Sequence, residues 1–216
     1  MRPVTLTWTI GGTGLVLCGV LGMLQYSLFG AGPVAGIVQD LVFAATVLLF
    51  ALGLSKEASV VARRPLGVTA LAVVALWPLV VLLANPLLPT MDAATFDAGL
   101  DAYRAAESIL TAAFYVDILV SIAAALVAAV QIARAGVVPR PWRWAPLWAV
   151  IASVAAGVLP QLLFAFTGPG DTQQLANAAM VIGALGLLVR TLGLGVLALV
   201  LAARVPHRTV EVFRSA

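Results

Sequence analysis

Six long apolar runs dominate the chain, and short polar or turn-forming stretches separate them. The separating stretches are GAGP at 30–33, SKEASVVARRP at 55–65, NPLLPTMDAATFDAGLDAYRAAE at 85–107, GVVPRPWR at 136–143 and TGPGD at 167–171. A transmembrane α-helix needs about 20 consecutive, mostly apolar residues, and Gly, Pro and charged clusters mark its ends. The pattern therefore predicts six membrane-spanning helices, at residues 5–29, 33–54, 65–88, 108–133, 144–166 and 175–203.

The composition indicates that lipid is the solvent of these runs. Of the 216 residues, 62% are hydrophobic and 10% are charged, and the mean hydropathy is +1.10. Soluble proteins are about 45–50% apolar and about 25% charged, so one aqueous core of this length cannot bury the apolar excess. The first run is also longer than the apolar segment of a signal peptide. We therefore predict an all-α integral membrane protein, with residues 1–216 forming a single six-helix transmembrane domain.

Charged residues are divided unequally between the two sides of the predicted bundle. Ten of the twelve basic residues lie on the side of both termini and of the loops after spans two and four: Arg2, Lys56, Arg63, Arg64, Arg134, Arg140, Arg143, Arg204, Arg208 and Arg214. The other side holds Arg104 with Asp92, Asp97, Asp101, Glu107 and Asp171. Cytoplasmic loops are enriched in Lys and Arg, which predicts cytoplasmic termini and contact of the basic tail, 204–216, with lipid headgroups. Because Arg outnumbers Lys eleven to one, a bacterial cytoplasmic (inner) membrane is favoured.

The long outer segment between spans three and four has its own helical pattern. Within residues 89–107, Phe96, Leu100 and Tyr103 recur at helical spacing, and charged residues take the opposite face. The pattern predicts a short amphipathic helix at the outer surface. Two interpretations stay open: a solvated helical connection, or a lid over an outer cavity.

Two opposite charges interrupt the predicted spans near their middle. Asp117 lies in AFYVDILVSI of span four, and Arg190 in GALGLLVRTLGLG of span six. An isolated charge inside a membrane costs several kcal/mol, and both residues lie on stripes of small residues that favour close helix packing. We therefore predict that Arg190 neutralises Asp117, with Asp40 of span two as a second candidate partner. The pair serves either to hold the spans together or to form a ligand or proton site.

Further polar residues fall in the outer halves of the spans. Gln39 and Asp40 lie in span two, Tyr115 in span four and Gln161, after Pro160, in span five, whereas the inner halves are nearly featureless. This distribution predicts a polar vestibule that opens outward above an apolar floor. The alternative is that these residues are simply interfacial. A continuous pore is disfavoured, because it would need polar lining at all depths.

Several function classes have no residues to support them. The basic residues form no continuous face for nucleic acid, and the single Cys18 and single His207 provide no disulfide or His/Cys metal site. No GxSxG, HExxH or Walker motif indicates an enzyme, and no cofactor is expected. Gly14, Cys18 and Gly22 form a small-residue stripe in span one, which predicts either a contact with a second copy or a partner subunit, or internal packing.

These observations lead to two functional hypotheses. The first is a membrane protein that binds or transports a small molecule reached from the outer side. Its ligand-binding residues would be Gln39, Asp40, Tyr115, Asp117, Gln161 and Arg190. The second is a scaffold or accessory subunit that packs against a partner membrane protein without transporting anything.

Overall fold

The computed structural model describes residues 3–27, 33–166 and 172–204, and every regular element within these ranges is a helix. The long helices are α1 (Pro3–Ser27), α2 (Pro33–Leu52), α3 (Pro65–Ala84), α5 (Leu100–Ala135), α6 (Ala145–Phe166), α7 (Thr172–Leu188) and α8 (Leu194–Ala203). The short ones are η1 (Lys56–Ala58), η2 (Asn85–Leu87), α4 (Ala93–Asp97) and η3 (Val189–Gly193). As predicted, six helices are long and apolar enough to cross a membrane; α7, η3 and α8 together form the sixth.

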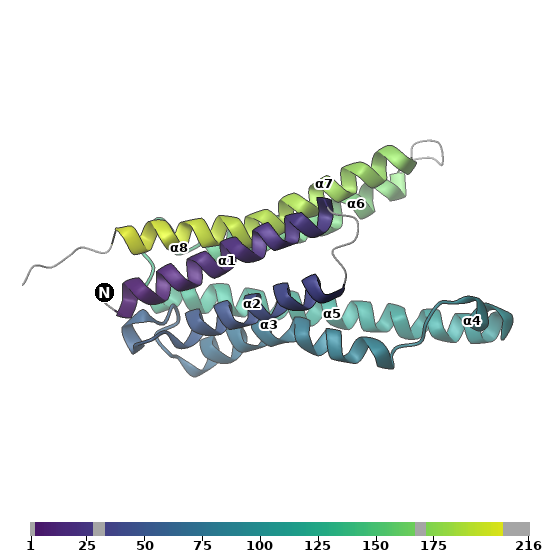
Figure 1. The fold of residues 1–216 in the computed structure, drawn as a ribbon, viewed down its shortest axis with the longest axis horizontal. Coiled ribbons are helices and arrows are strands. Elements are labelled where there is room, and N and C mark those ends of the chain that lie inside the picture. Colours follow the sequence, from purple (N-terminus) through teal and green to yellow (C-terminus); the bar gives the residue numbers. More distant parts are fainter. Residues whose placement is uncertain (1–2, 28–32, 167–171, 205–216) are drawn as a thin grey trace, which may run out of the picture.

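The six spans form a closed ring. Each span contacts its neighbours in the sequence, and the sixth span returns to pack along α1. Figure 1 shows the ring as two layers, one of α1, α6, α7 and α8 and one of α2, α3 and α5, which are joined by contacts of α1 with α2 and of α5 with α6. Within the described residues, the backbone of α5 does not come close to α7, η3 or α8, because α6 lies between them in the ring.

Small residues close the ring between α1 and the sixth span. A Cβ on Gly195 would lie 2.8 Å from the carbonyl oxygen of Gly12 and 2.9 Å from the backbone nitrogen of Val16. The two backbones are therefore nearly in contact, which only residues without a large side chain allow. This seam positions the sixth span against α1 and fixes the width of the ring.

The predicted small-residue stripe of span one packs inside the chain's own bundle. A Cβ on Gly14 would meet Thr46 of α2, and one on Gly22 would meet Leu187 of α7. Cys18, between them, is fully buried, and its Sγ–H lies 3.8 Å from the carbonyl oxygen of Gln39. Internal packing, one of the two open interpretations, therefore occupies these three residues.

The two ends of the bundle differ in charge. α1 begins and α8 ends at the same end, where the connections after α2 and α5 also lie (Figure 1). There Arg64 Nη1 donates to the carbonyl oxygen of Arg134 at 3.4 Å. We call this the basic end, because it carries Lys56, Arg63, Arg64, Arg134, Arg140, Arg143 and Arg204. The opposite, acidic end carries α4 and the beginning of α5 with Asp92, Asp97, Asp101 and Glu107.

The connection 53–64 is tightly built against the basic end of α2. Gly53, with φ +62°, ends the helix, and Arg63 donates from Nε to the carbonyl oxygen of Leu52 at 2.7 Å and from Nη2 to that of Gly53 at 3.1 Å. A cation at a helix C-terminus also complements the helix dipole. Ser59 Oγ donates to the carbonyl oxygen of Ala51 at 2.6 Å. These contacts bury Val60 against the ring interior.

The segment 89–107, predicted to form one short outer helix, belongs to two helices in the structure. α4 covers only Ala93–Asp97, and after Gly99 (φ +108°) one continuous helix, α5, runs from Leu100 to Ala135. At a rise of about 1.5 Å per residue α5 is about 54 Å long, whereas the hydrocarbon layer is about 30 Å thick. The helix therefore begins eight residues before the predicted span four, because the charged turns at 101–107 contain no helix breaker. The membrane-crossing part, 108–133, stays a prediction.

Local contacts organise the short helix α4 and its junction with α5. Asp92 caps α4 by accepting the Thr95 N–H at 2.9 Å. This bond, with those from the Thr90 and Thr95 hydroxyls, holds the pKa of Asp92 below its usual value. Phe96 and Tyr103 meet edge to face across the break, with ring centroids 6.2 Å apart. Leu100, the third residue of the predicted apolar face, stays exposed.

Candidate ligand-binding site

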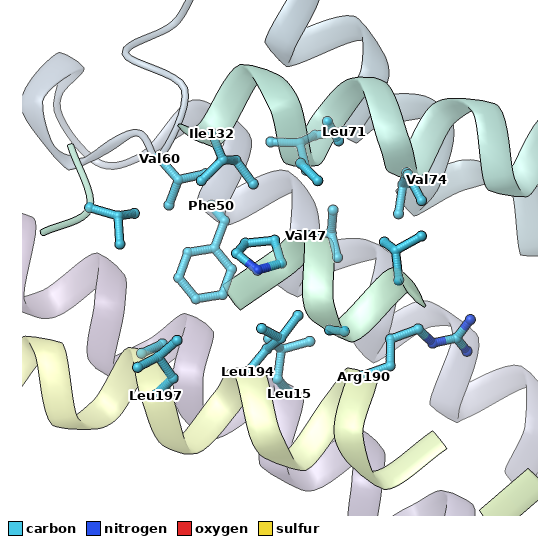
Figure 2. Close-up of a pocket in the computed structure, with 18 of the residues that line it drawn as sticks. Leu15, Val47, Phe50, Val60, Leu71, Val74, Ile132, Arg190, Leu194 and Leu197 are labelled. Carbon is cyan, nitrogen blue, oxygen red and sulfur yellow. The ribbon is translucent and has the colours of Figure 1, made fainter. Parts of the chain in front are cut away.

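The ring surrounds a partly open apolar cavity of about 180 Å³ in its half nearer the basic end. All six spans contribute to its wall, together with Val60 and Val138 of the basic-end connections (Figure 2). The lining residues are Trp8, Leu15, Phe43, Val47, Phe50, Val60, Leu71, Val74, Ala125, Ala128, Ala129, Ile132, Val138, Trp142, Pro146, Ala149, Val150, Arg190, Leu194, Leu197, Ala198 and Leu201. The cavity thus lies in the part of the bundle that the sequence predicted to be a featureless apolar floor.

Arg190 is the one charged residue among those that line the cavity. In Figure 2 its side chain lies at one end of the cavity, while Leu197, Phe50 and Val60 lie toward the other. Its Cζ lies 5.8 Å from the centre of the Phe43 ring, a distance at which a cation–π contact is attractive. The cavity therefore has a long apolar body and one cationic end.

A π-helical segment carries Arg190 into this position. η3, Val189–Gly193, interrupts the α-helical geometry of the sixth span. Within it Thr191 is buried, and its hydroxyl donates to the carbonyl oxygen of Leu187 at 2.7 Å. Single-turn π-helices inside longer helices occur frequently at functional sites, where they reposition one side chain.

Asp40 is the acidic residue associated with Arg190. It is half-buried on α2, one turn before Phe43, and the charge of Arg190 acts on its carboxyl group. The second candidate pairing from the sequence, between spans two and six, stays a prediction; what the structure shows is that the two charges act on each other.

Trp8 of α1 also lines the cavity. It is only 6% exposed and packs edge to face on Phe50, with ring centroids 6.3 Å apart. Its indole Nε1 is buried without a hydrogen-bond partner among the described residues, which costs roughly 1–3 kcal/mol. Trp8 also lines a second cavity of about 350 Å³ at the basic end, together with Pro139, Trp142 and Arg204. No feature of the sequence indicates this role, because Trp8 lies in an ordinary apolar run.

The structure corrects the predicted partner of Asp117. Trp77 of α3 donates from Nε1 to Asp117 Oδ1 at 2.7 Å, and Ser121 Oγ, one turn further along α5, lies 3.4 Å from the same oxygen. No contact described for Asp117 joins it to Arg190, and their helices are not neighbours. The predicted Asp117–Arg190 pair is therefore wrong, because α5 packs on α3 and not on the sixth span. An indole at matching depth in span three was the signal in the sequence that could have indicated Trp77.

The other predicted site residues do not line the cavity. Gln39 is half-buried beside α1, and its Oε1 is buried without a partner among the described residues. Tyr115 is 64% exposed and packs on Phe114, with ring centroids 5.9 Å apart. Gln161 is exposed, next to the buried Pro160 of α6. Of the six residues predicted to bind a ligand, only Arg190 reaches the cavity, and Asp40 acts on it electrostatically.

Within the described residues, no group of three or more His, Cys, Asp or Glu side chains is placed to hold a metal ion. Comparison of the chain with protein-family models, with curated proteins and with solved structures found no match. The ring and its cavity are therefore the features that indicate function.

Proposed function

We propose that this protein is a membrane-embedded binding or transport protein for a small molecule that occupies the cavity of the ring. The observation that carries the proposal is a partly open apolar space lined by all six spans, with the exposed Arg190 as its charged lining residue. Pockets for small molecules are concave and mostly apolar, with a few polar groups that orient the ligand. This arrangement matches that description, although it differs from the polar vestibule expected from the sequence.

The small side chains that leave the cavity open support a binding role. Ala125, Ala128 and Ala129 line it on α5, where larger apolar residues would fill the space. Packed protein interiors leave few voids larger than a water molecule, so a space of about 180 Å³ is large enough to receive a ligand.

The proposed orientation follows from the charges. We place the basic end in the cytoplasm of a bacterial cell, because loops rich in Arg and Lys stay on that side of the cytoplasmic membrane. The cavity then lies in the cytoplasmic half of the bilayer, and α4 with the first turns of α5 extends into the extracytoplasmic space. A scaffold role is less well supported, because the stripe predicted to bind a partner is buried against α2 and α7.

The proposal is tested by filling the cavity. Ala128 lines it, whereas Ala106, also buried on α5, does not. Bromobenzene is small enough to enter and quenches tryptophan fluorescence on contact, and Trp8 and Trp142 both line the cavity. We expect saturable quenching of the purified protein in detergent, lost in Ala128→Phe and retained in Ala106→Phe. Quenching that rises linearly and equally in all three proteins would reflect partition into the micelle and would refute the proposal.

A further inference from the structure

We infer that the ligand is a small amphiphile with an acidic head group, bound with its head at Arg190 and its apolar body along the cavity. This inference rests on the proposed function and specifies the chemistry of the ligand. It follows from three observations: the size of the cavity, the position of Arg190 and the charge of Asp40.

The size of the cavity limits the apolar body of the ligand. A cavity of about 150 Å³ lined by Leu, Ile and Phe side chains binds benzene. A volume of about 180 Å³ therefore holds an apolar body of about six to eight carbon atoms. The wall away from Arg190 consists mainly of aliphatic side chains such as Val47, Leu71 and Leu197. The Trp8 indole N–H is a neutral donor there, whereas Arg190 is the charged donor of the lining.

The position of Arg190 determines where a head group can lie. It is the charged member of the lining and stands at one end of the cavity (Figure 2). A guanidinium presents five N–H donors in a planar fork that matches carboxylate and phosphate oxygens. An acidic head group forms charge-assisted hydrogen bonds there, whereas a cationic head group is repelled.

Asp40 competes with the ligand for the charge of Arg190. Asp40 lies on α2 one turn before Phe43, whose ring centre is 5.8 Å from the Arg190 Cζ, and the charges of the two groups act on each other. Asp40 itself does not line the cavity. An acid that binds Arg190 therefore enters a site where another anion already acts. Removal of the Asp40 charge should strengthen acid binding, which is the opposite of what loss of a direct ligand contact would do.

Three probes with the same chain and different heads test the inference: octanoate, octanol and protonated octylamine. Isothermal titration of the purified protein should show octanoate binding roughly ten- to a hundredfold more tightly than octanol, with octylamine weakest. Arg190→Met should abolish the preference for octanoate, whereas the control Arg104→Met, on the exposed start of α5, should keep it. An equal affinity for octanoate and octanol in the wild type would overturn the inference.

A second variant keeps the test decisive where Arg190→Met does not fold. Asp40→Asn should bind octanoate on the order of tenfold more tightly than wild type and should leave octanol binding unchanged. Weaker octanoate binding in Asp40→Asn would contradict the competition and the inference with it.

Two further comparisons are needed. One distinguishes an acid from the lipid bilayer from an acid in solution, and the other distinguishes failure of the acidic ligand from failure of the cavity as a binding site. Loss of octanoate binding in nanodiscs of phosphatidic acid, but not of phosphatidylcholine, would identify an anionic lipid as the source; retention in both would identify an acid from solution. Either result supports an acidic amphiphile at Arg190. Saturable bromobenzene binding without any head-group preference would refute the acidic ligand alone, whereas the absence of all binding would refute the cavity as a ligand site.

Discussion

In the half of the ring nearer the basic end, side chains of all six spans line one apolar cavity. Toward the acidic end, the polar side chains lie on separate helices and line no shared space among the described residues. Arg190 lines the shared space. Asp117, in contrast, receives its hydrogen bonds from Trp77 and Ser121, which lie on α3 and α5.

The difference indicates how two intramembrane charges can have different roles. The neighbours of Asp117 supply donors directly, so its contacts join α3 to α5 without involving a cavity. Arg190 is placed by a π-helical segment at the end of an apolar space. Both charges have partners, but only Arg190 also lines a cavity. The contacts of Asp117 are therefore explained by stability, whereas Arg190 is a candidate for binding.

The largest effect is expected where the ring closes. Gly195→Leu would force a side chain into the backbone of α1 at Gly12 and Val16. Backbone cannot yield as a flexible side chain can, so we expect a loss of more than about 3 kcal/mol of stability, at or beyond the upper range for overpacked cores. Thermal unfolding in detergent measures this loss. The control is Gly157→Leu, where an added Cβ meets nothing within 4 Å; equal effects of the two variants would disprove the tight seam.

A smaller effect, confined to stability, is expected at Asp117. Trp77→Phe removes the indole donor and leaves the carboxylate with Ser121 alone. We expect a loss of roughly 1–3 kcal/mol, with octanoate affinity unchanged, and only a marginal change in the control Trp148→Phe, whose side chain is exposed. Melting and titration of the same samples separate the two readouts. If Trp77→Phe reduced octanoate affinity as much as Arg190→Met, Asp117 would belong to the binding site. The distinction between a structural Asp117 and a ligand-binding Arg190 would then be wrong.

The spans were predictable because each depends on its own composition and length. Their neighbours in the ring were not, because apolar runs of similar composition carry no information about which spans pack together. The pairing of Asp117 with Arg190 was inferred from depth and from small-residue stripes. Both features fit the observed neighbours equally well: α5, with Asp117, packs on α3, and η3, with Arg190, packs on α1. The start of α5 at Leu100 was not predicted either. The segment 89–107 was expected to form a separate helix, but no residue at 101–107 breaks the helix, so these residues belong to α5.

The cavity could not be predicted from polar residues, because its wall is almost entirely apolar. It arises where small side chains such as Ala128 and Ala198 meet larger ones across the ring without filling it. Arg190 was recognised because a charge in a membrane-spanning run is conspicuous in any sequence. Its role at the end of an apolar space depends on packing between six spans, which only the three-dimensional arrangement reveals.

The most direct test of the account is the position of a bound acid inside the ring. Crystals of the protein with 8-bromooctanoate should show one anomalous bromine peak between Val47 of α2 and Leu197 of α8, with the carboxylate at Arg190. Bromine peaks only on the lipid-facing surface, with the ring interior empty, would contradict the claim that this cavity binds an acidic amphiphile.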